Sequence, residues 1–267
     1  MSYLHGYSDE EQKRLTEQAE FLEFQVFQDV NFSDAQHILE VGCGVGAQSQ
    51  ILLRRFPKLR ITGVDLNEDQ LKTLNRRIGS GEISKERMSA VCANAENLPF
   101  KEDSFDGAFF CWILEHVPSP EKVLAEAKRV LRPGSKVVIS EVMNSSFFLD
   151  PYSPNVLKYW AAFNDYQYDK SGDPFTGVKL GNFLLNQEYK QIRTAVKSLY
   201  FDNREPLKRE NAIDYWTKLL LSAAPQLLLE KYVEQETVDG MKKELAAIAK
   251  NPSAVFFYAF IQATAEV

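Results

Sequence analysis

The stretch HILEVGCGVGAQS, residues 37–49, constrains the fold more than any other part of the chain. A short apolar run leads into Gly42, Gly44 and Gly46, and helix-forming residues follow at once. Glycine permits positive φ and removes the side chain that would keep a ligand away from the backbone. A strand, a glycine turn and a helix in this order are typical of nucleotide-binding α/β proteins. We therefore expect a nucleotide-like ligand at this turn.

Strand and helix signals alternate along the first half of the chain. Ser8 and Glu11 form a capping-box pattern, which predicts a helix over residues 9–28, and Asn67 is the expected cap of a later helix. Buried strands are predicted at 37–41, 60–66, 88–95, 105–111 and 136–142. Crossover-length helices separate these strands, including one from Ser119 to the LRPGS segment at 131–135. Such strands pair in parallel, and the ligand crevice lies at their carboxyl ends.

The second half is less regular. Helices are predicted over 155–168 and 181–192, most of 206–250 is helical, and 192–201 is a sixth strand. The last residues, 253–267, form a strong strand signal and are expected to pair antiparallel between the fifth and sixth strands. The fold class is therefore α/β, with a doubly wound, mostly parallel seven-stranded sheet. We expect the 267 residues to form one elaborated domain.

Composition and charge narrow the function. The chain is 45% hydrophobic and 25% charged, and it lacks the uninterrupted apolar run of about 18 residues that a membrane span needs. A net charge of -6 without a basic block argues against a nucleic acid partner. Cys43, Cys92 and Cys111 lack metal-ligand spacing, so we expect reduced thiols and no metal. The start of the chain lacks a secretory signal pattern, which points to the cytoplasm.

Spacing alone leaves the ligand open. Gly42, Gly44 and Ala47 also satisfy the dinucleotide pattern G-x-G-x-x-G/A, and Asp65 follows at a distance that a dinucleotide fold accepts. A nicotinamide-dependent oxidoreductase is therefore one interpretation. A cofactor-binding module without catalytic activity is another.

A set of motifs separates these interpretations. LEVGCGVG, GVDLNEDQL, ANAENLPFKEDSFD, WILEHV and LRPGSKVVISE follow one another over residues 37–141. In order and spacing they resemble class I S-adenosylmethionine-dependent methyltransferases, and most closely the small-molecule enzymes related to ubiquinone and menaquinone biosynthesis. Asn94 stands where many relatives have Asp, and Ser135 replaces the second glycine of a PGG motif. The resemblance implies a Rossmann-like sheet, a cofactor-binding core over 37–141, a lid helix over 1–30 and helical substrate-cap insertions over 150–180 and 206–250.

The resemblance also implies a cofactor site for S-adenosylmethionine. Glu40 is expected near the methionine end, Asp65 offers two acceptor oxygens to the ribose hydroxyls, and Leu66 packs on the adenine. The remaining expected cofactor contacts are Tyr3, Arg14, Gln18, Gly42, Gly44, Gln70, Asn94, Ala95, Cys111 and Trp112.

Methyl transfer from a sulfonium is a single displacement, so the protein chiefly aligns the reacting atoms. His116 and Glu141 follow the fourth and fifth strands and are the candidate bases for an acceptor that must lose a proton. Tyr152, Tyr159 and Trp160 are the expected substrate contacts, which predicts a small acceptor that is apolar, aromatic or cationic. Loop hydrogen bonding for His116, and core packing for the aromatic residues, are the competing interpretations.

Overall fold

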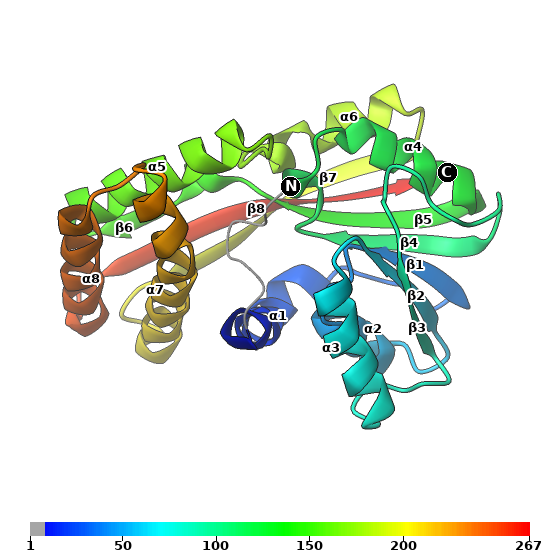
Figure 1. The fold of residues 1–267 in the computed structure, drawn as a ribbon, viewed down its shortest axis with the longest axis horizontal. Helices are drawn as coiled ribbons and strands as arrows, with labels where there is room; N and C mark the ends of the chain where they lie inside the picture. Colours follow the sequence, from blue (N-terminus) through cyan, green and yellow to red (C-terminus); the bar gives the residue numbers. More distant parts are fainter. Residues whose placement is uncertain (1–8) are drawn as a thin grey trace.

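The computed structural model describes residues 9–267 as one eight-stranded sheet with helices on both faces (Figure 1). The strand order is β3-β2-β1-β4-β5-β8-β6, and β7 pairs with β8. The first five strands are parallel to one another, whereas β8 is antiparallel to β5, β6 and β7. The strands are β1 His37–Val41, β2 Arg60–Asp65, β3 Met88–Cys92, β4 Phe105–Cys111, β5 Leu131–Val142, β6 Phe148–Asp150, β7 Lys190–Phe201 and β8 Val255–Glu266.

The helices form two groups around this sheet. Helices α4 and α6 contact one face, α1, α2 and α3 lie on the other, and α5, α7 and α8 pack together as a helical cap where β8 begins (Figure 1). The helices are α1 Asp9–Phe27, α2 Ala47–Arg55, α3 Glu68–Gly79, α4 Pro120–Val130, α5 Pro154–Asp169, α6 Leu180–Asn186, α7 Pro206–Leu229 and α8 Gln235–Lys250. Short 3-10 turns are η1 Leu114–His116, η2 Asn144–Ser146 and η3 Thr176–Lys179.

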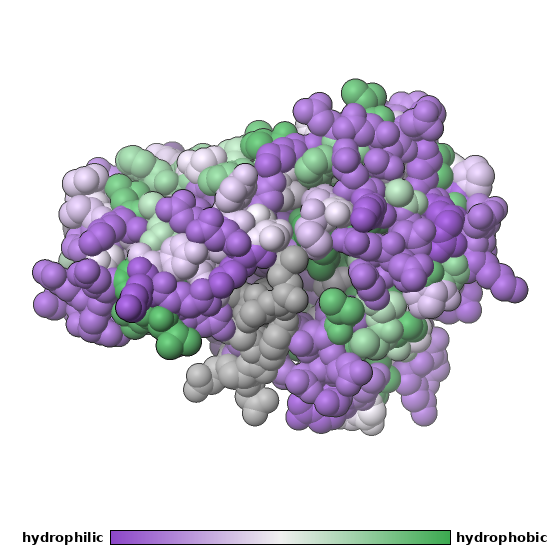
Figure 2. Space-filling view, turned by 45° about the horizontal axis from the view of Figure 1, so that its top comes forward, coloured by the Kyte–Doolittle hydropathy of each residue, from purple (hydrophilic) through white to green (hydrophobic). Residues whose placement is uncertain are grey.

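Strands β1 and β4 are buried on both faces, because successive side chains point to opposite sides of the sheet and helices cover both sides. Ile38 and Phe109 pack into one apolar cluster with α1 and α2, while Leu39 and Phe110 pack into a second cluster with α4 and α6. Successive apolar residues of β1 and β4 therefore serve two cores, as expected for a covered parallel sheet. On the face drawn in Figure 2, polar residues predominate and apolar patches are small and separate.

The architecture confirms the predicted fold class and the antiparallel insertion of the last strand between β5 and β7. Three details differ from expectation. The three-residue β6 is an additional strand. It pairs with the start of β8, on the same side of β8 as β5. The LRPGS segment belongs to β5, because Leu131 pairs with Phe105 before a bulge, and α4 ends at Val130. Helix α6 ends at Asn186, since β7 begins at Lys190.

The predicted helix starts are partly confirmed. The Asn67 side chain accepts the N–H of Gln70 at 2.9 Å and caps α3. In a full capping box the Gln70 side chain would accept the N–H of Asn67. Here that N–H donates to Asp65 Oδ1 at 2.8 Å instead. Helix α1 covers the predicted range to within one residue, whereas its predicted cap Ser8 lies outside the described residues.

The close approach of η3 to the end of β5 gives a stability prediction. A Cβ on Gly177 would lie 2.5 Å from the Glu141 carbonyl oxygen and 2.6 Å from that of Val142, and neither backbone atom can move aside. Gly177→Ala should therefore lower the free energy of unfolding by about 1 to 3 kcal/mol, the usual cost of overpacking. Gly181→Ala in α6 is the matched control, because its Cβ would meet only Thr194 Cγ2 at 3.7 Å. Equal denaturant midpoints for the two variants would contradict the prediction.

Candidate cofactor and acceptor site

One cavity of about 520 Å³ lies at the carboxyl ends of the parallel strands. One half is lined by the glycine turn after β1 and by the residues that follow β2, β3 and β4. The other half is lined by side chains of α1, α5, α7 and β8. The cavity therefore joins the part of the site predicted for a nucleotide to the helical cap.

The glycine turn has the conformation that the sequence predicts, although its glycines also serve packing. Gly42, Gly44 and Gly46 have φ values of 73°, 50° and 78°. A Cβ on Gly42 would lie 2.8 Å from Ile113 Cγ1, and one on Gly44 would lie 2.5 Å from Gln70 Oε1. Gly42 and Gly44 line the cavity, as does Gln70. Neighbouring side chains thus occupy the space that the missing Cβ atoms leave, and positive φ is a second requirement for glycine.

Asp65 stands at the end of β2 and lines the cavity. The N–H of Gly44 donates to Asp65 Oδ2 at 2.9 Å, which ties this carboxylate to the glycine turn. Burial raises the pKa of Asp65, while hydrogen bonds from the N–H groups of Asn67 and Gly44 oppose that rise. The next residue, Leu66, is 67% exposed and also lines the cavity. A carboxylate beside an uncovered apolar side chain matches a ribose next to a base.

The expected contacts after β3 and β4 also line the cavity: Asn94, Ala95, Cys111 and Trp112. Asn94 Oδ1 accepts the N–H of Glu96 at 2.9 Å, so the side chain shapes its own turn. Burial raises the pKa of the Cys111 thiol well above its usual value, which keeps it protonated. Trp112 has a φ of 55° and meets Phe260 edge to face at 5.8 Å.

Glu40 is buried at the end of β1 and is not among the residues that line the cavity. Ser49 Oγ donates to Glu40 Oε2. Burial raises the pKa of Glu40 to about 8, the Ser49 hydrogen bond opposes the rise, and the charge of Asp65 adds to it. Glu40 is therefore held by Ser49 of α2 and is not among the residues that line the cavity.

Glu141 is also buried away from the cavity lining. Its Oε1 accepts the N–H groups of Ile113 at 2.9 Å and Leu114 at 2.7 Å, and Oε2 accepts that of Glu115 at 3.3 Å. Burial, followed by the charge of Glu115, raises the pKa of Glu141, against these hydrogen bonds. Glu141 therefore holds the loop after β4 and is not among the residues that line the cavity.

His116 ends η1 and is among the residues that line the cavity. Its Nε2 lies 3.6 Å from Glu115 Oε1. Glu115 is 6% exposed, also lines the cavity, and accepts Gln167 Nε2 on Oε2 at 2.7 Å. The structure thus supplies a carboxylate beside the predicted base. Glu115 was not predicted as a site residue, although it is adjacent to His116 in the sequence.

The predicted substrate residues separate clearly. Trp160 lines the cavity and donates from Nε1 to the Asn144 carbonyl oxygen at 2.9 Å. Tyr159, the preceding residue, is fully buried, and its hydroxyl donates to the Leu220 carbonyl oxygen. Tyr152 is 77% exposed. Neither tyrosine is among the lining residues. Tyr152 lies before α5, and α5 directs Trp160 toward the cavity while it packs Tyr159 against α7.

Helix α1, which lies within the predicted lid, supplies part of the cavity wall. Arg14 is 6% exposed and makes a two-point ion pair with Glu11, at 2.7 and 2.6 Å, while Nη1 donates to Gln18 Oε1 at 3.0 Å. Both Arg14 and Gln18 line the cavity. Tyr3, the other predicted lid contact, lies outside the described residues.

Several lining residues were not predicted as contacts. The cap and β8 contribute Phe163, Tyr166, Tyr215, Trp216, Tyr258 and Phe260. The aromatic enrichment of these segments was the available signal, but it did not distinguish lining residues from buried ones. All three tryptophans of the chain, Trp112, Trp160 and Trp216, lie on this cavity.

The raised pKa of Glu40 gives a prediction for stability against pH. The folded protein holds the Glu40 proton up to about pH 8, whereas the ordinary value is 4.5. The stability that this proton contributes is complete below about pH 4.5 and is lost as the pH rises toward 8. The amide of Glu40→Gln has no proton to lose in this pH range, so the variant keeps this contribution. Between pH 5 and 8 the wild type should therefore lose on the order of 3 kcal/mol of unfolding free energy relative to Glu40→Gln.

The control is Glu126→Gln, because the Arg129 hydrogen bond lowers the pKa of Glu126 and removes its titration from this interval. Denaturant unfolding of the three proteins at several pH values provides the measurement. Parallel pH curves for wild type and Glu40→Gln would contradict the prediction.

The described residues, 9–267, include no cluster of His, Cys, Asp and Glu suited to a metal ion. Over the same range, no helix combines the length and apolar character that crossing a membrane requires.

Comparison with known proteins agrees with this geometry. Residues 39–139 match the model of the methyltransferase domain family. The O-methyltransferase resE of Aspergillus sclerotiorum is 36% identical over 123 residues, which are 46% of this chain and 44% of that protein. The ubiquinone/menaquinone biosynthesis C-methyltransferase UbiE of Paracoccus denitrificans is 35% identical over 129 residues, 46% of this chain and 51% of that protein. The chain thus spans about half the length of these curated relatives.

Solved structures extend the likeness of fold beyond the core. The phosphoethanolamine N-methyltransferase 2 of Haemonchus contortus, in complex with phosphomonomethylethanolamine and S-adenosylhomocysteine, covers 92% of this chain with a TM-score of 0.58 and 17% identity. This chain covers 52% of that one. None of these matches supports the nicotinamide interpretation. The match of residues 39–139 to a methyltransferase domain confirms the resemblance to class I S-adenosylmethionine-dependent methyltransferases.

Proposed function

We propose that this protein binds S-adenosylmethionine and transfers its methyl group to a small-molecule acceptor. The observation that carries the proposal is one continuous cavity, whose wall includes Asp65, the glycine turn, His116 and an aromatic half. The relatives named above are methyltransferases that match over the cofactor-binding core. A cavity with a nucleoside-type end and a separate apolar end suits two reactants that must meet.

The residues on the nucleoside half fit this cofactor. Asp65 presents a carboxylate to a pair of hydroxyls, and Leu66 presents an exposed apolar face to a purine. Asn94 and Ala95 line the wall where the edge of that purine would lie. Bound there, S-adenosylmethionine supplies an activated methyl group on a positively charged sulfur.

The chain then has to align the acceptor and take its proton. The aromatic half, lined by Trp216 and Phe260, excludes water and holds the acceptor. His116 lies on the cavity wall, where it can accept the proton of a hydroxyl as the new bond to carbon forms. Glu115, 3.6 Å from His116 Nε2, stabilises the imidazolium that results.

A small acceptor also agrees with the overall charge. The net charge of -6 disfavours a polyanionic nucleic acid. Cys43, Cys92 and Cys111 are free thiols, which fits the reducing cytoplasm that we propose as the location. A binding module without turnover is the remaining rival, and only an assay of methyl transfer separates it from an enzyme.

Asp65 provides the test of cofactor binding. Asp65→Ala removes charge-assisted hydrogen bonds to the ribose, which are worth roughly 1.5 to 3 kcal/mol. Calorimetry should show S-adenosylhomocysteine binding about 10- to 100-fold more weakly. Asp69→Ala on exposed α3 is the matched control and should bind as the wild type does, because Asp69 pairs with Lys72 at the surface. An unchanged affinity in Asp65→Ala would remove this residue from the site.

His116 provides the test of turnover. Wild-type protein incubated with methyl-labelled S-adenosylmethionine and metabolite extracts should yield a labelled small molecule. With that acceptor, His116→Ala should lower turnover by about 100-fold or more, the range for one positioned proton-transfer group. Cofactor affinity should stay nearly constant, because its contacts come from Asp65 and the glycine turn.

His37→Gln is the control for a purely structural histidine. His37 bonds Thr62 at 2.9 Å, outside the cavity lining, so its loss should affect stability and leave activity per folded molecule intact. If His116→Ala keeps the wild-type rate between about pH 6 and 9, His116 is not the base. If none of the metabolite extracts yields a labelled product, the protein is a binding module.

A further inference from the structure

The acceptor half of the cavity has walls built from aromatic rings. Trp160 stacks on Phe163 with ring centroids 5.1 Å apart, and Trp216 lies 4.6 Å from Tyr258. All four side chains line the cavity, as does Phe260. Flat, rigid walls of this kind bind ring-shaped apolar molecules through large contact areas at low entropic cost.

The cations near this half are already neutralised. Apart from His116, the cationic residues among the described lining residues are Arg14 and Lys170. Arg14 is held by both oxygens of Glu11, and Lys170 pairs with Glu230 at 2.6 Å. A phosphate or diphosphate group needs unshielded guanidinium or ammonium donors, or a metal ion. These two pairs do not provide them.

The other polar groups of the walls are mostly engaged with one another. Tyr258 donates to Asn144 Oδ1 at 2.9 Å, and Trp160 donates to the Asn144 carbonyl oxygen. Gln167 is bonded to Glu115. The carboxylate of Glu115 is therefore the charged group at the reacting end, beside His116. A carboxylate there repels anions and favours an acceptor that gives up a proton.

We propose that the acceptor is an uncharged, unphosphorylated ring-shaped molecule with a hydroxyl group that faces the Glu115–His116 pair. This inference rests on the proposed function. The O–H proton passes to His116 while the oxygen takes the methyl group and the sulfur recovers the electron pair of the broken bond. A cationic acceptor is disfavoured because the sulfonium brings a positive charge to the same place. The likeness to a protein solved with phosphomonomethylethanolamine therefore does not extend to the acceptor.

Four probes with one naphthalene body separate the possibilities. They are 2-naphthol, 2-naphthyl phosphate, 2-methoxynaphthalene and (2-naphthylmethyl)trimethylammonium. Binding is measured by calorimetry on protein saturated with sinefungin, whose ammonium stands in for the sulfonium charge. We expect 2-naphthol to bind about 10-fold more tightly than either charged probe, and at least as tightly as the methoxy compound.

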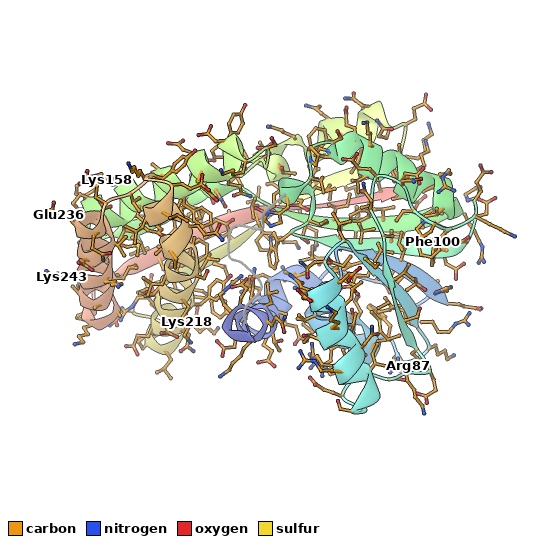
Figure 3. All side chains as sticks on the ribbon, viewed as in Figure 1. Arg87, Phe100, Lys158, Lys218, Glu236 and Lys243 are labelled. Carbon is orange, nitrogen blue, oxygen red and sulfur yellow. The ribbon has the colours of Figure 1, made fainter. Side chains whose placement is uncertain are left out.

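Variants assign the preference to the carboxylate. In Glu115→Gln the advantage of 2-naphthol over 2-naphthyl phosphate should shrink by about 5-fold or more, because one repulsive charge is gone. Glu236→Gln is the control. Figure 3 labels Glu236 at the outer end of the cap, where it is exposed, and this variant should keep the wild-type preference.

Each outcome bears on one proposal. If sinefungin itself does not bind, the proposed cofactor, and with it the proposed function, is wrong. If sinefungin binds but the phosphate or the ammonium probe matches or exceeds 2-naphthol, the acceptor class is wrong while the function stands. An unchanged preference in Glu115→Gln would also overturn the proposed role of that carboxylate.

Discussion

The site depends on one buried carboxyl group that does not touch the cavity. Glu141, at the end of β5, collects the N–H groups of three successive residues in the loop after β4. This contact sets Ile113 against the Cβ-less side of Gly42 and brings Glu115 and His116 to the cavity. A loop that had to leave these N–H groups unpaired would lose the hydrogen bonds that define its path. The part of the cavity wall that contains Glu115 and His116 therefore depends on the hydrogen bonds between Glu141 and three main-chain N–H groups.

The half of the cavity at the glycine turn was largely predictable, because a parallel sheet determines where its strands end. Once β1, β2 and β4 are recognised, their carboxyl ends must share one edge, so Gly42, Asp65 and Cys111 had to lie near one another. Local sequence sufficed for these positions. Glu40 is the exception, since it is bonded to Ser49 and is not among the lining residues, and the alternation along a short strand did not reveal that.

The half of the cavity lined by α5, α7 and β8 could be predicted less completely. Tyr159 and Trp160 are neighbours on α5, and which of them faces the cavity depends on how that helix packs against α7. Tyr152 lies before α5 and points to solvent. Glu115 and Gln167 meet across 52 residues of sequence, a pairing that only the tertiary structure shows. Residues on packed helices carry a periodicity that identifies a buried face, but not the partner of that face.

The placement of the three tryptophans has a consequence for how the protein can be observed. Trp112, Trp160 and Trp216 are the whole complement of the chain, and each lies on the cavity wall. Indole emission from the native protein therefore originates entirely from the site, without a background from distant fluorophores. When tryptophan is excited selectively, at the long-wavelength end of protein absorption, the emission wavelength reports the polarity of the cavity. The molecule carries its own optical sensor for whatever enters it.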